Sequence, residues 1–545
     1  MSNTFYSRNK EILLKLSSIF IVLLLFGIIE VTIRIIFPDK SSDNMIDIGA
    51  INLFSKEIIK EETWYKISNK NAYSDRNTLF KKDKEKDQFR IICLGGSASA
   101  SWPHPPPEIY STYLEKSLQE LYPSKKIEII NCSAHGFASY RIRQVFETII
   151  PLKPDAVIIW SGNNEFLERR NYKTSELKNF LIDFRNNFRS LTLVSELISK
   201  HKYNDTPDVA ETFWKKVNEE ALELRSNPEQ FEKVKEHYRQ SMESIVNEAE
   251  INNITLLLMT VPVNLRDWEP NVSYLGLNSN DSIQWIEEFK DGKNQMLSSD
   301  YSEAIVSFSN ANKIAPNHAE TCFWLARAYE LNNDTISALK YYIEAKDLDY
   351  NPFRVISDFN NILSAIANNN PEVVLIDMEE MIRRYAHNGI PGFDLFLDYV
   401  HPTKDGNMVI ACETANIILK TNLVSATAVS KRIRLNEIKE INQSDYLDEN
   451  DMYVQFTRFS LCCMTHQYYS ALYFGKILKD KIPPELSNTT NSEKINLIND
   501  AIETFQQYID LEKTSIIRKP SMEEEQNVMN DIKSFYRKHF PYGAF

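Results

Sequence analysis

Five short apolar runs, rich in Ile and Val, most constrain how this chain can fold. Each run ends at turn-forming or polar residues, and the five are Phe89 to Leu94, Ile127 to Asn131, Ala156 to Trp160, Ile254 to Val261 and Val373 to Ile376. Apolar runs with little alternation are typical of strands buried on both faces. Stretches with a helical period, notably Ile109 to Leu121 and Phe231 to Ile251, lie between them. The pattern predicts an α/β fold with a parallel, doubly wound sheet, whose ligand site lies at the carboxyl ends of its strands.

An internal repeat fills the long gap between the fourth and fifth runs. The gap is about a hundred residues, far more than one crossover helix requires. Within it, Ala304, Phe308 and Ala311 are matched 34 residues later by Ala338, Tyr342 and Ala345. A 34-residue period with small residues where paired helices touch resembles the tetratricopeptide repeat. We therefore expect an all-α insertion over residues 281–352, with an ordinary helical hairpin as the alternative.

Length, charge and cysteine usage exclude several classes of protein. A chain of 545 residues exceeds the usual limit of one hydrophobic core, so we expect two or three folded units. The net charge of −13 argues against nucleic acid as a partner, because binding to phosphate backbones needs a basic face. The six cysteines have no metal-like spacing, so we expect buried free thiols, with a disulfide in an oxidising compartment as the alternative. We assign neither a metal nor a cofactor.

The N-terminal region has the pattern of a membrane anchor. Leu13 to Phe37 is mostly apolar, and Leu16 to Ile29 carries no charge. A bilayer core needs about 20 such residues, and no small-residue cleavage site follows the run, so we expect an uncleaved signal anchor. Basic residues stand at or before its start, namely Arg8, Lys10 and Lys15. They predict a cytoplasmic N-terminus, with the bulk of the chain on the periplasmic side of a bacterial inner membrane.

Glycines are scarce, and several of them follow the first three predicted strands. Only 13 occur in the chain, and Gly95, Gly96, Gly136 and Gly162 lie just past those strands, where the chain must turn and expose backbone amides. Ser97 stands directly on the first of these turns. The sequence Asp398-Tyr-Val-His401 follows about three hundred residues later.

These residues supply the parts of a nucleophilic site. A serine hydroxyl needs a base, and His401 suits that role near neutral pH. Asp398 can orient the imidazole and stabilise its cation. The amides of Ser97 and Gly136 and the side chain of Asn164 could stabilise the oxyanion. The alternatives are structural: a turn serine at 97, a helix-capping loop at 398–401 and an N-cap at Asn164.

Four short blocks in chain order resemble the SGNH (GDSL-type) hydrolase superfamily. They are Gly95-Gly96-Ser97, Asn131 to Gly136, Gly162 to Glu165, and Asp398-x-x-His401. The resemblance implies a flavodoxin-like three-layer fold with Ser97 as nucleophile, Gly136 and Asn164 as oxyanion donors, and Asp398 and His401 completing the triad. One position departs from the family pattern, because Gly96 stands where Asp is usual. The segments 263–267 and 102–107 also resemble the repeat-containing, membrane-anchored branch.

Three other polar residues near these blocks have structural interpretations. We expect His135 to be a supporting or core histidine. Glu165 is expected to pair on the surface or to shape the site. Arg266 could clamp an anionic group, but a structural ion pair with Asp267 is the favoured interpretation.

The leading hypothesis is a membrane-anchored, extracytoplasmic ester hydrolase that forms an acyl-serine intermediate on an acylated glycan, lipid or small ester. Transfer of the acyl group to a sugar hydroxyl is the first alternative. A scaffold that binds a protein partner through its repeats is the second. No substrate-binding residue is assigned.

The sequence predicts the following organisation along the chain. A cytoplasmic tail over 1–12, an anchor over 13–37 and a juxtamembrane segment over 38–87 come first. A hydrolase domain over 88–280 and 353–425 follows, interrupted by the insertion over 281–352, and a helical C-terminal region covers 426–545.

Overall fold

The computed structural model describes residues 54–60, 62–67, 79–167, 223–441, 449–481, 492–517 and 520–539, together with Gly27 and Thr32. The chain divides into two compact units, and every helix and strand discussed here belongs to the unit formed by Leu53–Arg169 and Ala210–Phe545. The anchor expected over 13–37 lies outside the described residues, apart from Gly27 and Thr32. Among the residues that are described, no helix has the length and apolar character needed to cross a bilayer.

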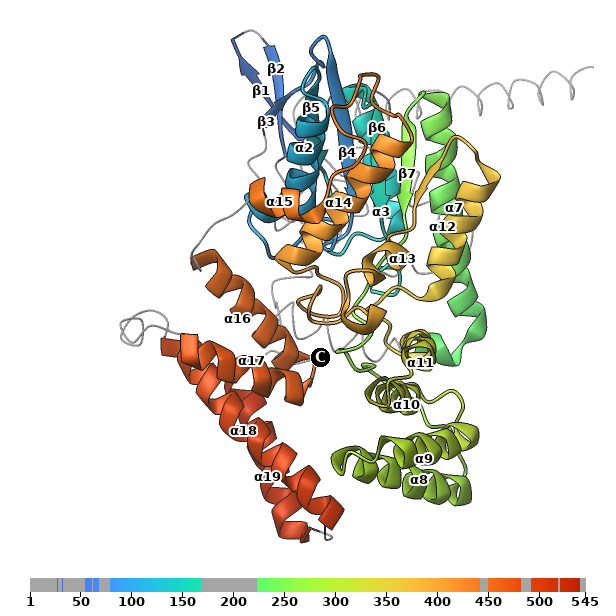
Figure 1. Cartoon of the computed structure of the whole chain (residues 1–545), viewed down its shortest axis with the longest axis vertical. Helices are drawn as coiled ribbons and strands as arrows, with labels where there is room; N and C mark the ends of the chain where they lie inside the picture. The colour runs from blue at the N-terminus through green and yellow to red at the C-terminus, as the bar shows by residue number, and fades with distance from the viewer. Residues whose placement is uncertain are drawn as a thin grey trace, which may run out of the picture. The chain divides into compact units, whose positions relative to one another are not determined.

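A five-stranded parallel sheet forms the core of the α/β domain (Figure 1). Its order is β5 (Lys126–Asn131), β4 (Gln88–Gly95), β6 (Ala156–Trp160), β7 (Thr255–Met259) and β8 (Val374–Ile376). All four strand pairs are parallel. Every residue of β4 and β6 is buried, as expected for apolar strands covered on both faces. The five predicted strands and the flavodoxin-like order are confirmed.

Helices cover both faces of this sheet. Right-handed crossovers place helices on opposite faces when the strand order reverses at β4. On one face α2 (Tyr110–Leu121) packs against α14 (Lys404–Lys420). On the other, α7 (Pro228–Ile251) packs against both α3 (Ser139–Ile149) and α12 (Ser357–Asn369). The short helix α13 (Met378–Arg383) follows β8 and contacts α14.

A small antiparallel sheet precedes the main one. It consists of β1 (Phe54–Ile59), β2 (Glu62–Ile67) and β3 (Leu79–Lys81). Three aromatic rings, those of Phe54, Tyr65 and Phe80, cluster with centroid separations of 5.7 to 6.2 Å. These strands lie in the polar stretch 38–87 and lack a continuous apolar run, so the sequence pattern does not predict them.

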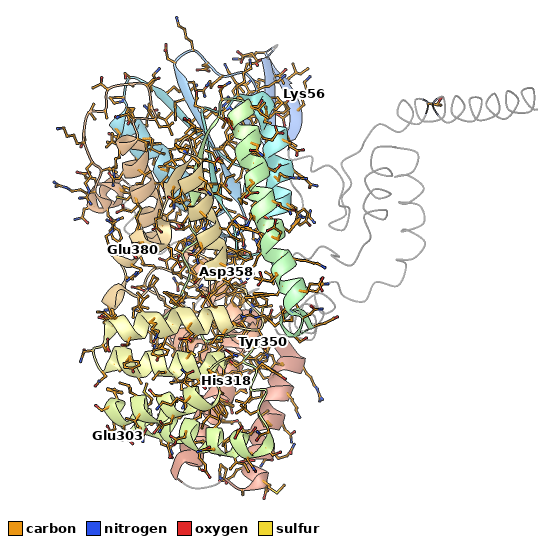
Figure 2. All side chains as sticks on the ribbon, turned by 90° about the vertical axis from the view of Figure 1, so that its right-hand side faces the viewer. Lys56, Glu303, His318, Tyr350, Asp358 and Glu380 are labelled. Atoms are coloured by element: carbon orange, nitrogen blue, oxygen red, sulfur yellow. The ribbon has the colours of Figure 1, made fainter. Side chains whose placement is uncertain are left out.

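Four helices form the insertion between β7 and the second part of the α/β domain. They are α8 (Ser279–Leu297), α9 (Tyr301–Ile314), α10 (Ala319–Leu331) and α11 (Thr335–Leu348), and each packs against the next (Figures 1 and 2). The repeated positions are all buried at the helix contacts, namely Ala304, Phe308, Ala311, Ala338, Tyr342 and Ala345. Two successive helix pairs agree with the 34-residue period. The assignment to the tetratricopeptide family stays a prediction.

The C-terminal region is helical, as expected. After α15 (Leu435–Ile441), the helices α16 (Glu449–Met464), α17 (Tyr468–Lys481), α18 (Ser492–Ile517) and α19 (Met522–His539) pack in sequence, each on the next (Figure 1). Small or aromatic residues, such as Ala471, Ala501 and Phe505, are fully buried between them. All six cysteines of the chain are buried free thiols.

Candidate active site

Ser97 stands on a tight turn at the carboxyl end of the central strand β4. Gly95 ends the strand, and the turn is closed by hydrogen bonds from Ala100 N to Gly96 O (2.9 Å) and from Trp102 N to Ser97 O (3.1 Å). Asn131, at the end of β5, donates to the Ser99 carbonyl at 2.9 Å and so holds the turn from the neighbouring strand. Ser97 is half-buried, so its hydroxyl remains accessible at the edge of the sheet.

Asp398, His401 and Ser97 form one hydrogen-bonded chain. His401 Nε2 lies 2.8 Å from Ser97 Oγ, and His401 Nδ1 lies 2.6 Å from Asp398 Oδ2. The other carboxylate oxygen, Oδ1, accepts the backbone N–H groups of Val400 and His401, each at 2.8 Å. Because this carboxylate acts as acceptor throughout, Nδ1 carries the proton and Nε2 is the acceptor for the serine hydroxyl. Asp398 is fully buried, so water does not compete for these bonds.

Asn264 fixes the backbone that carries Asp398. Its side-chain Nδ2 donates to Asp398 O at 3.0 Å, and its own N–H donates to Tyr399 O at 3.0 Å. The side-chain oxygen accepts Asp267 N, which closes the turn after β7. Asn264 is completely buried. Asn264 lies in the segment 263–267 but was not among the predicted site residues. Its only signal in the sequence is an amide between two apolar neighbours just past a strand.

Asn164 and Gly136 lie at the ends of the two flanking strands. Asn164 Nδ2 donates to Phe137 O at 3.0 Å, and an ideal Cβ on Gly96 would lie only 2.4 Å from the same nitrogen. The amide of Asn164 therefore sits directly beside the Gly96-Ser97 peptide, with one N–H left for another acceptor. Gly136 is exposed, has a φ of +70° and has nothing within 4 Å of the position of a Cβ. There is therefore open space beside the backbone of Gly136.

This arrangement explains why the chain has Gly at position 96. Any side chain there would displace the Asn164 amide, because 2.4 Å is far inside van der Waals contact. Position 96 therefore has no room for a side chain while the Asn164 amide stays where it is.

Two buried residues shape the loop that carries Asn164. Glu165 accepts both the backbone N–H and the hydroxyl of Ser139 at 2.8 Å, which satisfies the N-terminus of α3. Asn163 accepts Val355 N at 2.9 Å, and Val355 belongs to the segment that follows the helical insertion. Glu165 therefore supports the site from the interior and does not pair on the surface.

Aromatic and basic residues surround His401. The ring of Trp102 packs edge-on against His401 at 4.9 Å and against His135 at 5.5 Å. His135 thus packs against Trp102, which agrees with the predicted supporting role of this histidine.

His104 connects the loop after Ser97 to the loop that carries His401. Its Nε2 donates to Pro402 O at 2.9 Å, since a carbonyl can only accept. Nearby, Lys404 Nζ lies 2.6 Å from Glu108. His104 and Lys404 together lower the pKa of Glu108 to about 2.

The structural interpretation of Arg266 agrees with the geometry. Its guanidinium contacts Asp267 Oδ2 at 2.9 Å and Asp394 Oδ1 at 3.0 Å. Asp267 Oδ2 also accepts Phe393 N at 2.8 Å. This cluster ties the turn after β7 to the start of the loop that carries Asp398.

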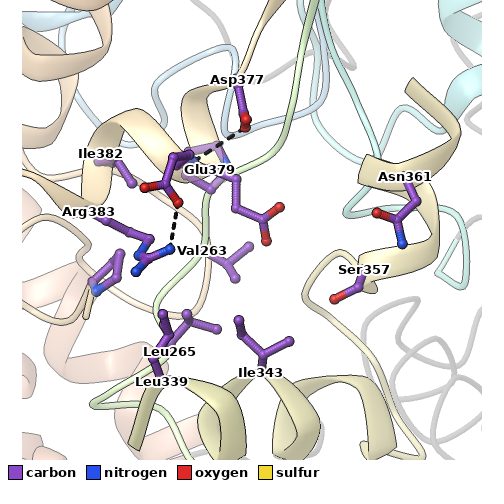
Figure 3. Close-up of a pocket in the computed structure, with 13 residues that line it drawn as sticks. Val263, Leu265, Leu339, Ile343, Ser357, Asn361, Asp377, Glu379, Ile382 and Arg383 are labelled. Atoms are coloured by element: carbon purple, nitrogen blue, oxygen red, sulfur yellow. Dashed lines mark hydrogen bonds and ion pairs between the residues drawn. The ribbon is translucent and has the colours of Figure 1, made fainter. Parts of the chain in front are cut away.

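A cavity of about 230 Å³ lies apart from Ser97, between the insertion and the carboxyl ends of β7 and β8 (Figure 3). Leu339 and Ile343 of α11 line one wall, and Glu379 and Arg383 of α13 line another. Ser97, Gly136, Asn164, Asp398 and His401 do not line it. The cavity is therefore separate from the hydrogen-bonded chain of Ser97, His401 and Asp398.

Comparisons with known proteins gave similarity at the level of structure. No protein-family model matches the sequence, and no curated protein matches it. Similar solved structures include a GDSL-like lipase from Bacteroides thetaiotaomicron, at 12% identity over 61% of this chain and 88% of that protein, with a TM-score of 0.27. Another is an acetylxylan esterase from Geobacillus stearothermophilus, at 14% identity over 61% of this chain and 94% of that protein, with a TM-score of 0.28. At these values the function of this chain has to be inferred from its own site geometry.

Proposed function

We propose that this chain is a serine ester hydrolase of the SGNH type. The observation that carries the proposal is the hydrogen-bonded chain from Ser97 through His401 to Asp398, at the carboxyl edge of the parallel sheet. That edge is where α/β folds of this kind bind their ligands. Both links in the chain are within ordinary hydrogen-bond length, so a proton can pass from Ser97 to His401 without rearrangement.

In the proposed reaction, Ser97 Oγ attacks the acyl carbon of an ester while His401 Nε2 takes the hydroxyl proton. Asp398 holds the imidazole and stabilises the imidazolium that forms. The imidazolium then gives its proton to the departing alkoxide, which leaves an acyl-serine and an alcohol. Water attacks the acyl-serine with His401 again acting as base, and the carboxylic acid is released. Ser97 and His401 return to their starting protonation states.

The oxyanion formed in both steps needs donors, and we assign the backbone amides of Ser97 and Gly136 and the side chain of Asn164. Support comes from the position of Asn164 Nδ2 beside the Gly96-Ser97 peptide and from the open space at Gly136. Each such donor typically contributes about 3 to 4 kcal/mol to the barrier reduction.

The test is labelling of Ser97 together with turnover of simple aryl esters. A fluorophosphonate should label the wild-type protein at Ser97, and Ser97→Ala should lose both the label and turnover. Ser133→Ala is a matched control, because Ser133 is a buried serine on the neighbouring loop whose hydroxyl contacts Ser99. Aryl ester turnover that persists in Ser97→Ala would contradict the proposal.

We extend this proposal to the acyl donor and to the cellular location. We propose an acylated glycan, lipid or small ester as substrate and a membrane anchor at 13–37, supported by the apolar run and the basic residues before it. An ester panel of increasing chain length, assayed with and without a glycan acceptor, would identify the acyl group and would separate hydrolysis from transfer. Protease accessibility of the C-terminal region in intact and permeabilised cells would test the orientation.

A further inference from the structure

The loop that carries Asp398 and His401 is a narrow hairpin-like segment, from Gly392 to Thr403. Its two arms pair through Leu397 N to His401 O at 2.7 Å and Thr403 N to Leu395 O at 2.9 Å. Phe396 and Pro402 form an isolated bridge between the arms. This loop brings Asp398 and His401 to the site, so its placement relative to Ser97 sets the length of the hydrogen bond between His401 and Ser97.

Arg458 of α16 binds this loop from the C-terminal helical region. Its guanidinium Nη2 donates to Phe393 O at 2.9 Å and to Phe396 O at 3.2 Å. The charged group lies 3.9 Å from the ring centroid of Phe474 in α17 and 4.7 Å from that of Phe393. The two rings pack edge to face at 5.0 Å, so they enclose the guanidinium. Phe396 is only two residues before Asp398.

A guanidinium at this position is costly. Arg458 is 8% exposed, and burial lowers its pKa to about 10. An apolar side chain of similar volume would fill the same space without the desolvation cost. An apolar side chain could not donate hydrogen bonds to the carbonyls of Phe393 and Phe396. The geometry therefore favours a role in holding the loop over a role in packing.

We propose that Arg458 is a positioning residue for the site, through which the C-terminal helical region holds the loop of Asp398 and His401 in register with Ser97. This inference rests on the proposed ester hydrolysis. If the hydrogen bonds from Arg458 to the loop are removed, the loop is held less firmly. His401 then spends less time at hydrogen-bond distance from Ser97. A displacement of about 1 Å at a reacting group can cost roughly 10²-fold in rate.

The test compares Arg458→Met and Arg458→Lys with a matched control, Tyr536→Phe. Tyr536 of α19 donates to Cys463 O of α16 at 2.7 Å, so the control loosens the same helix without contacting the loop. We expect Arg458→Met to lower kcat for an aryl ester by about 10- to 100-fold with KM within twofold. Arg458→Lys should recover part of the loss, because an ammonium can still donate to the carbonyls. Tyr536→Phe should retain the wild-type kcat.

A second measurement does not depend on catalysis. Hydrogen exchange of the amides of Leu397, Val400 and His401 should accelerate in Arg458→Met and stay at the wild-type rate in Tyr536→Phe. If the wild-type protein hydrolysed no ester, the proposed function would fail, while the exchange experiment would still decide whether Arg458 holds the loop. A folded Arg458→Met variant with wild-type exchange and kcat would overturn the inference. If Arg458→Met did not fold, the same two measurements on Arg458→Lys would decide the question.

Discussion

Replacement of Gly96 by alanine tests the proposed oxyanion hole at the contact between Gly96 and Asn164. The added Cβ would lie 2.4 Å from Asn164 Nδ2 and 3.4 Å from Phe137 O. Since carbon contacts are comfortable at about 3.5 Å or more, the amide nitrogen has to move by about 1 Å. A shift of that size breaks the 3.0 Å bond from Asn164 to Phe137 O. It also moves Nδ2 away from the position in which we propose that it donates to an oxyanion.

The expected effect is large on catalysis and small on stability. Loss of one oxyanion donor costs about 3 to 4 kcal/mol, which corresponds to a decrease in kcat of roughly 10²- to 10³-fold. The lost hydrogen bond costs about 1 kcal/mol in the free energy of unfolding. Replacing glycine by alanine returns about 0.4 to 1 kcal/mol by restricting the unfolded chain. The thermal midpoint should therefore change by only a few degrees while turnover of an aryl ester falls steeply.

A double-mutant cycle shows whether the effect passes through Asn164. Asn164→Ala alone should lower kcat by a similar factor, and adding Gly96→Ala to it should change kcat by less than about threefold, since the methyl group then has room. The reasoning would be refuted by a Gly96→Ala variant with near wild-type kcat. It would equally be refuted if the two losses multiplied, because the substitution would then act on the Ser97 turn itself.

Two further predictions concern the insertion. Lys346 is fully buried and its Nζ donates to Asp347 at 2.6 Å and to Val355 O at 2.9 Å. Lys346→Met removes the bond to that carbonyl, so urea unfolding should show that the free energy of unfolding falls by about 1 to 3 kcal/mol. The kcat should fall as well, because Val355 holds Asn163. An unchanged free energy of unfolding together with an unchanged kcat would contradict the prediction. Burial lowers the pKa of His318 to about 4 from 6.5, so between these values the unfolded state binds more protons and stability decreases as the pH falls. His318 lies within the insertion (Figure 2), and its replacement by Asn retains a side-chain acceptor for Thr321 N. The His318→Asn variant should lose on the order of 3 kcal/mol of this pH dependence of stability. A thermal midpoint that falls between pH 7 and pH 4.5 as much in the variant as in the wild type would disprove the prediction.

The fold of the sheet was predictable because its signals are local. Ile and Val runs of strand length need no knowledge of their neighbours, and β6 covers the same residues that the sequence predicts. The edge strand β8 is shorter than its run by one residue. The strands β1 to β3 were missed because their stability comes from cross-strand aromatic contacts, such as Tyr65 on Phe80, between residues that are separated in sequence.

The site was predictable to the extent that strand ends identify it. Ser97 lies two residues past the end of β4 and Asn164 four residues past the end of β6, and parallel strands bring such residues to one edge. Asn264 follows a strand too, but its role depends on Asp398, which is 134 residues away. Arg458 had no signal at all, because a single arginine in a helix is ordinary until its partners Phe393 and Phe396 are known.

The contacts of the helical insertion decide how a protein partner of this insertion should be sought. The insertion contributes Lys346 and leads into Val355, which bonds Asn163 beside the proposed oxyanion donor. Deletion of the whole segment 281–352 would therefore remove a support of the site together with any binding surface, and loss of activity would not identify a partner. Substitutions at exposed apolar residues of the insertion avoid this. Ile336, which is 84% exposed at the start of α11, can be changed to Asp without contact with Lys346 or Val355. Loss of a copurifying protein with kcat retained in that variant would separate binding from catalysis.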